Sequence, residues 1–229
     1  MTTKVVMAWS GGKDSALALW RLQRDPQVQV LGLLTTFTRR YQRVQMHGVR
    51  RILVEAQAEA LGLPLHTVWL QPQAGNAAYE EGVRGALATL RDEGATHVAF
   101  GDLFLQDIRA WREQLLAPTG LAPLFPLWGQ DSTALAHEVV TAGFHATVVC
   151  VDPRRLSARL LGRRYDEKLL RELPDGVDPC GENGEFHTFV HDGPSFAWPL
   201  ATMLGVHREW QQHLFADLLP VAQRPALQA

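Results

Sequence analysis

The clearest chemistry in this sequence belongs to a glycine loop that lies between an apolar run and a helical pattern. The loop consists of Ser10, Gly11, Gly12, Lys13, Asp14 and Ser15. A loop that passes from a strand into a helix can direct backbone N–H groups toward an anion. The two glycines permit a close approach to phosphate, the two serine hydroxyls can donate hydrogen bonds, and Lys13 adds a positive charge. Asp14 could help to hold Mg²⁺, or could act as a cap in the first helical turn.

The loop differs from two better-known phosphate motifs. It is neither the G-x-x-x-x-G-K-[ST] of a Walker A loop nor the G-x-G-x-x-G of dinucleotide-binding proteins, so γ-phosphoryl transfer and dinucleotide binding are not favoured. The local residues leave a second interpretation open, in which this is an N-capped helix after a glycine turn.

A second polar cluster follows Asp178-Pro179-Cys180. Its candidate substrate-binding or catalytic residues are Gly181, Glu182, Asn183, Gly184, Glu185, His187 and Thr188. Carboxylates stabilise a cation, and an imidazole can take a proton near neutral pH. We therefore expect Glu182, Glu185 and His187 to recognise or deprotonate an amine or ammonium ion. The alternative is a solvated turn before a strand.

Two further segments could contact a nucleotide. Gly101 and Asp102 come directly after an apolar strand pattern, where they could bind ATP or Mg²⁺ or serve as a turn and helix cap. The basic segment Arg39, Arg40, Arg43 and His47 could close over phosphates, or could be a solvated run of charge.

These segments need elements to position them, and the hydrophobic pattern supplies an alternation of strands and helices. Expected strands cover residues 4–9, 28–37, 65–70 and 97–100, with helical patterns after each of the first three. The run at 28–37 is apolar nearly throughout, as in a strand buried on both faces. The alternation predicts an α/β fold with an open parallel sheet, helices on both faces and a ligand crevice beyond the carboxyl ends of the strands.

In the second half of the chain the regular alternation of strand and helix patterns ends. We expect a helix at 107–116, a proline- and glycine-rich link at 118–126, a helix at 132–142 and a strand at 145–151. The pattern predicts two domains, residues 1–125 with the glycine loop and residues 126–229 as a smaller α+β region; the resemblance given below implies that the first binds ATP and the second binds the substrate. Residues 206–220 fit either a helix or a strand, and residues 222–229 are expected to form a frayed tail.

Composition limits the remaining function classes. The 229 residues are 46% hydrophobic and 20% charged, and the formal net charge of −2 gives no field that would attract nucleic acid. No apolar run approaches the length of a membrane span, so we expect a cytoplasmic protein without a membrane partner. Cys150 and Cys180 cannot form a disulfide framework or a Cys-x-x-Cys zinc site. The sequence does not determine the oligomeric state, and a homodimer stays open.

The loop SGGKDS after the first strand resembles the PP-loop of the ATP pyrophosphatases. Together with GDL at 101–103, PLW at 126–128, LGRRYD at 161–166 and the block at 178–189, it resembles one branch of that superfamily, the diphthine ammonia ligase family and its bacterial relatives. The resemblance extends from about Lys4 to Phe196. It implies a Rossmann-like, HUP-type parallel sheet with helices on both faces.

The resemblance also implies an activity. Members cleave ATP between the α and β phosphates, adenylate a carboxylate, and let ammonia or an amine displace AMP, with Mg²⁺ as the expected metal. It places pyrophosphate in the glycine loop, adenine near the end of the second strand at Thr36, and a substrate carboxylate at Arg163. Where the archaeal and eukaryotic ligases carry a block that resembles EGGE, this sequence reads ENGEFHT. Asn183 and His187 depart from that block, which predicts an acceptor other than diphthine, on a small molecule or a protein.

Two functions other than an amide-forming ligase could use such a glycine loop, namely sulfur transfer and the regulatory binding of ATP. Sulfur transfer is disfavoured because the chain has neither paired cysteines nor a basic face. A regulatory protein that binds ATP without turnover would need the same glycine loop, but it gives no role to the second cluster.

Overall fold

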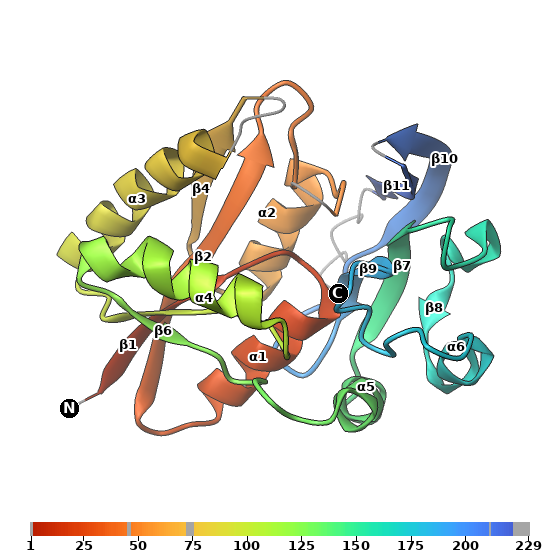
Figure 1. The fold of residues 1–229 in the computed structure, drawn as a ribbon, viewed down its shortest axis with the longest axis horizontal. Coiled ribbons are helices and arrows are strands. Elements are labelled where there is room, and N and C mark those ends of the chain that lie inside the picture. The colour runs from red at the N-terminus through yellow and green to blue at the C-terminus, as the bar shows by residue number, and fades with distance from the viewer. Residues whose placement is uncertain (1, 45–46, 72–75, 211, 222–229) are drawn as a thin grey trace, which may run out of the picture.

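The computed structural model describes residues 2–44, 47–71, 76–210 and 212–221, and the tail predicted at 222–229 lies outside them. The molecule has two sheets, each with its own helices (Figure 1). None of the helices in the described part of the chain is long and apolar enough to cross a membrane.

Sheet A confirms the predicted α/β architecture. Its parallel strands lie in the order β4-β2-β1-β5-β6, and a short strand, β3, pairs antiparallel with β2. The strands are β1 (Thr3–Ala8), β2 (Val28–Thr38), β3 (Arg43–Val44), β4 (Leu65–Leu70), β5 (His97–Ala99) and β6 (Ala122–Leu124).

Helices cover both faces of sheet A, as predicted. Helices α1 (Lys13–Gln23) and α2 (Arg51–Ala60) pack in one apolar cluster, while α3 (Asn76–Asp92) and α4 (Gln106–Leu116) pack in another (Figure 1). Successive strand side chains point to opposite faces. Val5 and Met7 of β1 therefore join the α1 and α2 cluster, and Val6 joins the other.

The link predicted at 118–126 contains more structure than expected. It holds a 3₁₀ turn, Ala117–Thr119, followed by β6, which pairs with β5. Pro123 lies within β6, and proline usually argues against a strand because it cannot donate to the ladder. Here β6 is at the edge of sheet A, where that missing donor is tolerated.

Sheet B forms the smaller C-terminal α+β region and is antiparallel. Strands β8, β9 and β11 all pair with β7, and β10 pairs with β11. The elements are α5 (Ser132–Thr141), β7 (His145–Val151), a 3₁₀ turn (Ala158–Leu160), β8 (Arg164–Tyr165), α6 (Glu167–Glu172), β9 (Phe186–Asp192), β10 (Thr202–Trp210) and β11 (His213–Pro220). The segment 206–220 that fitted either a helix or a strand thus belongs to a hairpin, with Gln212 at φ 65° in its turn.

One apolar cluster extends from sheet A into sheet B. It includes Met7 and Leu17 from the N-terminal half together with Val148 and Phe189 from the C-terminal half. The backbone of β9 also reaches the glycine loop directly, because Val190 N donates to Gly11 O at 2.9 Å. The two predicted motifs therefore belong to neighbouring parts of one packed structure.

Candidate functional site

The glycine loop forms a turn whose hydroxyls and amides bond to one another. Gly11 has φ 80°, a conformation that side chains disfavour. Ser10 Oγ accepts from Gly12 N at 3.2 Å and lies 3.1 Å from Ser15 Oγ. Helix α1 begins at Lys13 without a side-chain cap from Gly12, so the positive end of its dipole faces the loop. This arrangement can hold an anion.

Gln57 of α2 holds the glycine loop in place through hydrogen bonds. Its side chain is fully buried, and Nε2 donates to Gly11 O at 3.0 Å and to Val190 O at 2.7 Å. Its Oε1 accepts from Trp9 Nε1 at 3.0 Å. Gln57 is not among the residues that the sequence motifs indicated, although a glutamine within the buried stripe of Val54, Gln57 and Ala58 signals a required hydrogen bond.

Lys13 connects the loop to the second motif. Its side chain is 2% exposed, and Nζ lies 3.0 and 2.9 Å from the two carboxylate oxygens of Asp14. Nζ also donates to the carbonyl of Cys180 and lies 5.4 and 5.2 Å from the ring centroids of Tyr165 and Phe186. Burial lowers the pKa of Lys13, but the neighbouring Asp14 carboxylate and Cys180 outweigh it, so the pKa is raised and the ammonium is retained.

Thr188 of β9 closes the start of α1 from the other side. Its hydroxyl accepts from Lys13 N at 3.1 Å, so the C-terminal region supplies the cap that Gly12 lacks. Two residues that the sequence placed in separate motifs are therefore in direct contact.

Glu182 brings the strand-end residues into the same site. Its Oε1 accepts from Leu103 N at 2.7 Å, next to Gly101 and Asp102. Burial, together with the charges of Asp14 and Asp102, raises the pKa of Glu182 to about 7, although the hydrogen bond from Leu103 acts in the opposite direction. A Cβ on Gly101 would lie 3.0 Å from the backbone of Asp14, so any larger residue would force the two backbones apart.

Glu185 is fully buried within the motif. Its Oε1 accepts from Asp178 N at 3.2 Å and from Asn183 Nδ2 at 3.1 Å, and lies 3.4 Å from the Arg155 guanidinium. Its Oε2 has no hydrogen-bond partner among the described residues. A buried carboxylate oxygen without a partner is costly, and a bound N–H donor would satisfy it.

The chain of the second motif reverses direction at two glycines with positive φ. Gly181 has φ 71° and Gly184 has φ 83°. A Cβ on Gly181 would lie 2.7 Å from the carbonyl of Phe186, whereas Gly184 has open space around it. The tight turn at Gly181 therefore sets the start of β9 and the position of Glu182.

His187 stacks on His47, with ring centroids 4.3 Å apart and an interplanar angle of 28°. Burial lowers the pKa of His47 to about 4, and burial together with His47 lowers the pKa of His187 well below its ordinary value. Both imidazoles are therefore neutral at pH 7 and can accept hydrogen bonds through an unprotonated ring nitrogen. His47 Nδ1 has no partner among the described residues.

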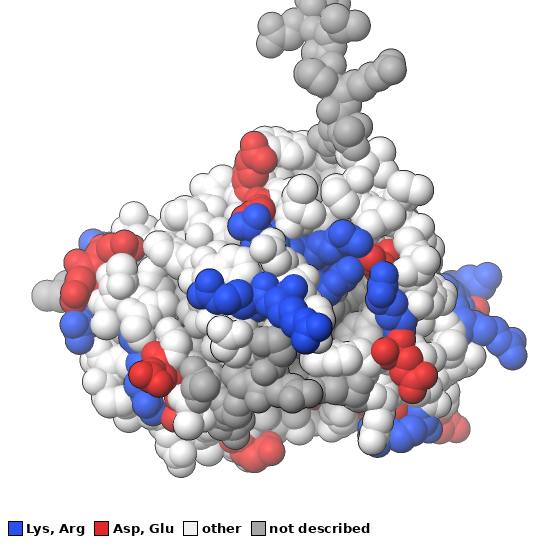
Figure 2. Space-filling model, turned by 90° about the horizontal axis from the view of Figure 1, so that it is seen from above, with Lys and Arg blue, Asp and Glu red and all other residues white. Residues whose placement is uncertain are grey.

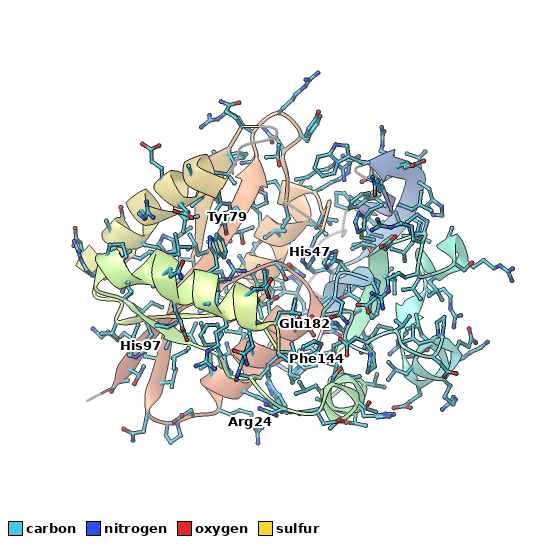
Figure 3. The ribbon with its side chains drawn as sticks, in the orientation of Figure 1. Arg24, His47, Tyr79, His97, Phe144 and Glu182 are labelled. Carbon is cyan, nitrogen blue, oxygen red and sulfur yellow. The ribbon has the colours of Figure 1, made fainter. Side chains whose placement is uncertain are left out.

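Thr36 lines a pocket of about 330 Å³ that opens beside Ser10. The same pocket is lined by the aromatic side chains of Tyr79 in α3, Phe100 directly after β5, and Trp111 in α4. Such a cavity, largely apolar with a few polar groups, suits a nucleobase next to a phosphate loop. Figure 3 shows Tyr79 on the sheet A side, with His47 and Glu182 near the junction of the two sheets.

The structure does not bring every predicted residue to this cluster. Arg163 forms an ion pair with Glu172 of α6. In the basic segment, Arg39 stacks on Trp69 and Arg43 pairs with Asp217, so His47 is the member that reaches the glycine loop.

Comparison with known proteins gives consistent matches along the chain. Residues 3–123 match the family model described as diphthamide synthase N-terminal domain, and residues 131–218 match the model described as diphthamide synthase C-terminal domain. The chain is 31% identical over 158 residues to a diphthine–ammonia ligase of Danio rerio, and this match covers 62% of each chain. It is 27% identical over 219 residues to the ligase of the same name from Rattus norvegicus, covering 84% of this chain and 80% of the relative. The chain thus spans less than two thirds of the length of the zebrafish relative.

Proposed function

The chain belongs to the diphthamide synthase family, and we propose that it is an ATP-dependent ligase that adenylates a carboxylate and transfers ammonia or an amine to it. The observation that carries this proposal is the double connection between the glycine loop and the acidic motif. Lys13 joins Asp14 to the Cys180 carbonyl, and Glu182 binds the strand end at Leu103. A phosphate-binding loop and groups that can hold an ammonium ion thereby share one site.

In the first half-reaction, an acceptor carboxylate oxygen attacks the α-phosphorus of ATP, and the bond to the β-phosphate breaks. The products are an acyl-adenylate and pyrophosphate. The glycine loop and the N-terminus of α1 would hold the pyrophosphate, since backbone N–H groups there favour negative charge. The pocket at Thr36 would hold the adenosine.

In the second half-reaction, ammonia attacks the acyl carbon, the amide forms and AMP leaves with the electron pair of the broken bond. The attacking nitrogen carries an extra proton that a base must remove. Glu182, whose pKa is about 7, can take up this proton, while the unpartnered Oε2 of Glu185 and the neutral imidazole of His187 can accept hydrogen bonds from the nitrogen donor. We assign these three residues to the nitrogen donor.

A divalent cation fits the site. No group of three or more His, Cys, Asp or Glu side chains in the described part of the chain is arranged to hold a metal by itself. Mg²⁺, however, commonly takes one or two carboxylates together with phosphate oxygens. Asp14 and Asp102 both raise the pKa of Glu182, so a cation among them would relieve this repulsion. Asp14 and Asp102 would hold Mg²⁺, which would neutralise charge on the phosphates.

We propose an acceptor other than diphthine for this chain. Asn183 donates to Glu185, and His187 stacks on His47, so both departures from the EGGE-like block take part in the site. A small-molecule or protein-borne carboxylate, free ammonium or an amine, no nucleic acid and a cytoplasmic location remain our proposals on the sequence grounds above. The oligomeric state, including a homodimer, stays open.

The products of ATP cleavage test the proposed function. The protein is incubated with ATP, Mg²⁺, ammonium and a small-metabolite extract, and the nucleotides are resolved by chromatography. We expect AMP and pyrophosphate that depend on the extract. Asp14→Ala should abolish them, whereas Asp107→Asn should not, because Asp107 is an exposed carboxylate in the first turn of α4. ADP would contradict the proposal, and bound but uncleaved ATP would favour a regulatory protein.

A further inference from the structure

Asp217 of β11 is a buried carboxylate held by two arginines from the segment before α2. It is 5% exposed, and its oxygens accept from Arg50 Nε at 2.8 Å and from the Arg50 terminal nitrogen at 2.7 Å. The Arg43 guanidinium lies 2.9 Å from the same carboxylate. Basic side chains gather in the middle of the face that Figure 2 shows.

We call the described residues 43, 44 and 47–50 the strap. Val44 N donates to Val49 O at 2.8 Å, and Gly48 N donates to Val44 O at 3.0 Å, so the strap folds on itself. Gly48 packs against the ring of Phe215 in β11, where a Cβ would lie only 2.7 Å from the ring. The hairpin β10–β11 therefore holds one side of the strap by ion pairs and by close packing.

The other side of the strap faces the pocket that we propose for the nucleotide. Val44 and His47 line the pocket of about 330 Å³ beside Ser10. His47 Cε1 lies 3.2 Å from the point where a Cβ on Gly12 would be, so the imidazole covers the glycine loop. The strap thus connects the ion pairs at Asp217 to the proposed phosphate site.

Building on the proposed function, we infer that Asp217 is a positioning residue for nucleotide binding, acting through Arg43 and Arg50 to hold His47 over the glycine loop. Two charge-assisted contacts from one guanidinium fix direction as well as distance. The sequence distance between Asp217 and the glycine loop gives no hint of this connection. In this account the C-terminal hairpin contributes to ATP affinity although it does not touch ATP.

The test measures binding of the α,β-methylene analogue of ATP, with Mg²⁺, by isothermal titration calorimetry. We expect Asp217→Asn to raise the dissociation constant about three- to thirtyfold, the range for residues that act through a network. Asp217→Glu should restore most of the affinity. The matched control is Asp152→Asn, because Asp152 is also 5% exposed and its ion pair, 2.7 Å to Arg154, lies outside the strap.

A double-mutant cycle distinguishes positioning from general loss of structure. His47→Ala should weaken binding, and Asp217→Asn should add little in that background because both changes act on one contact. Arg50→Gln provides a second variant with a half-exposed site, and thermal unfolding of each variant shows that it is folded.

An unchanged dissociation constant in Asp217→Asn and Arg50→Gln, an equal loss in Asp152→Asn, or additive effects with His47→Ala would overturn the role of Asp217. If the wild-type protein failed to bind the analogue, the proposed nucleotide site would fail, and this inference with it.

Discussion

At the scale of single residues, Glu182 combines a cost in stability with a role in the site. Burial and two neighbouring carboxylates raise its pKa from 4.5 to about 7 in the folded protein. The unfolded chain releases this proton more readily, so the free energy of unfolding falls as pH rises from about 4.5 to about 7. Above pH 7 Glu182 is ionised in the folded protein, and the free energy of unfolding is lowered by the full cost of burying this charge.

We predict that Glu182→Gln stabilises the protein by about 1–3 kcal/mol at pH 8 and has little effect at pH 4. The amide oxygen can still accept from Leu103 N, so the backbone contact is kept. AMP formation should fall at least about tenfold, since a neutral amide binds ammonium poorly. Urea unfolding at both pH values, beside Glu59→Gln at an exposed site, checks the prediction. Equal stability changes at pH 4 and pH 8 would refute it.

Gly101 is a second residue at which the structure leaves little freedom. We predict that Gly101→Ala lowers the free energy of unfolding by about 1–3 kcal/mol, because the new Cβ meets the backbone of Asp14 and Ser15 at 3.0 Å. Backbone cannot move aside as a flexible side chain can, so ATP binding should weaken as well.

Gly85→Ala is the matched control for this substitution. Gly85 lies in α3 with nothing within 4 Å of a built Cβ, so alanine should stabilise that helix by about 0.5–1 kcal/mol. Thermal unfolding and calorimetric titration with the ATP analogue measure both variants. A Gly101→Ala protein with wild-type stability and affinity would show that the backbone after β5 can shift to accommodate the added Cβ, which would contradict the prediction.

At the scale of elements, α2 positions the glycine loop through Gln57. We predict that Gln57→Leu lowers the free energy of unfolding by about 2–4 kcal/mol, since the Trp9 indole N–H and the Val190 carbonyl lose their partners. Gln29→Leu, at an exposed position of β2, should change it by less than about 0.5 kcal/mol. Urea denaturation curves compare the two variants, and similar midpoints would mean that Gln57 does not fix the loop.

Periodicity predicted most elements of sheet A because each strand and helix there satisfies a local pattern. The run 28–37 matches β2 closely, and in sheet B the expected strand 145–151 matches β7. Strand β6 was missed because Pro123 signals a break, and only its edge position in the sheet makes it acceptable. The hairpin β10–β11 was ambiguous because its many exposed apolar side chains give no clear period.

The candidate site was predictable where chemistry is concentrated in sequence. Glycine, lysine and carboxylates in short blocks indicated the loop and the motif at 181–188. The contributions of Gln57 and Asp217 depend on contacts between distant segments, which no spacing rule contains. Arg163 is the opposite case. The sequence made it a candidate for binding a substrate carboxylate, but in the structure it forms an ion pair with Glu172.

At the scale of the whole molecule, one apolar cluster crosses from sheet A to sheet B. We therefore predict a single cooperative unfolding transition, in which tryptophan fluorescence and far-ultraviolet circular dichroism change together. Two separated transitions would show that the halves are stable independently.

The division into residues 1–125 and 126–229 remains our proposal about function rather than about stability. The N-terminal part carries the glycine loop proposed for phosphate and the pocket proposed for adenosine, while the C-terminal part carries Glu182, Glu185 and His187. In this account the acceptor and the nitrogen donor approach from the sheet B side, and the reaction occurs where β9 meets α1.

The central claim is that adenylation precedes the entry of the nitrogen donor. The most direct measurement is exchange of radiolabelled pyrophosphate into ATP, with the small-metabolite extract present and ammonium absent. Our account predicts extract-dependent exchange without ammonium, and a fall in exchange when ammonium is added, because the adenylate is then consumed. Exchange that requires ammonium, or formation of ADP in place of AMP, would contradict it.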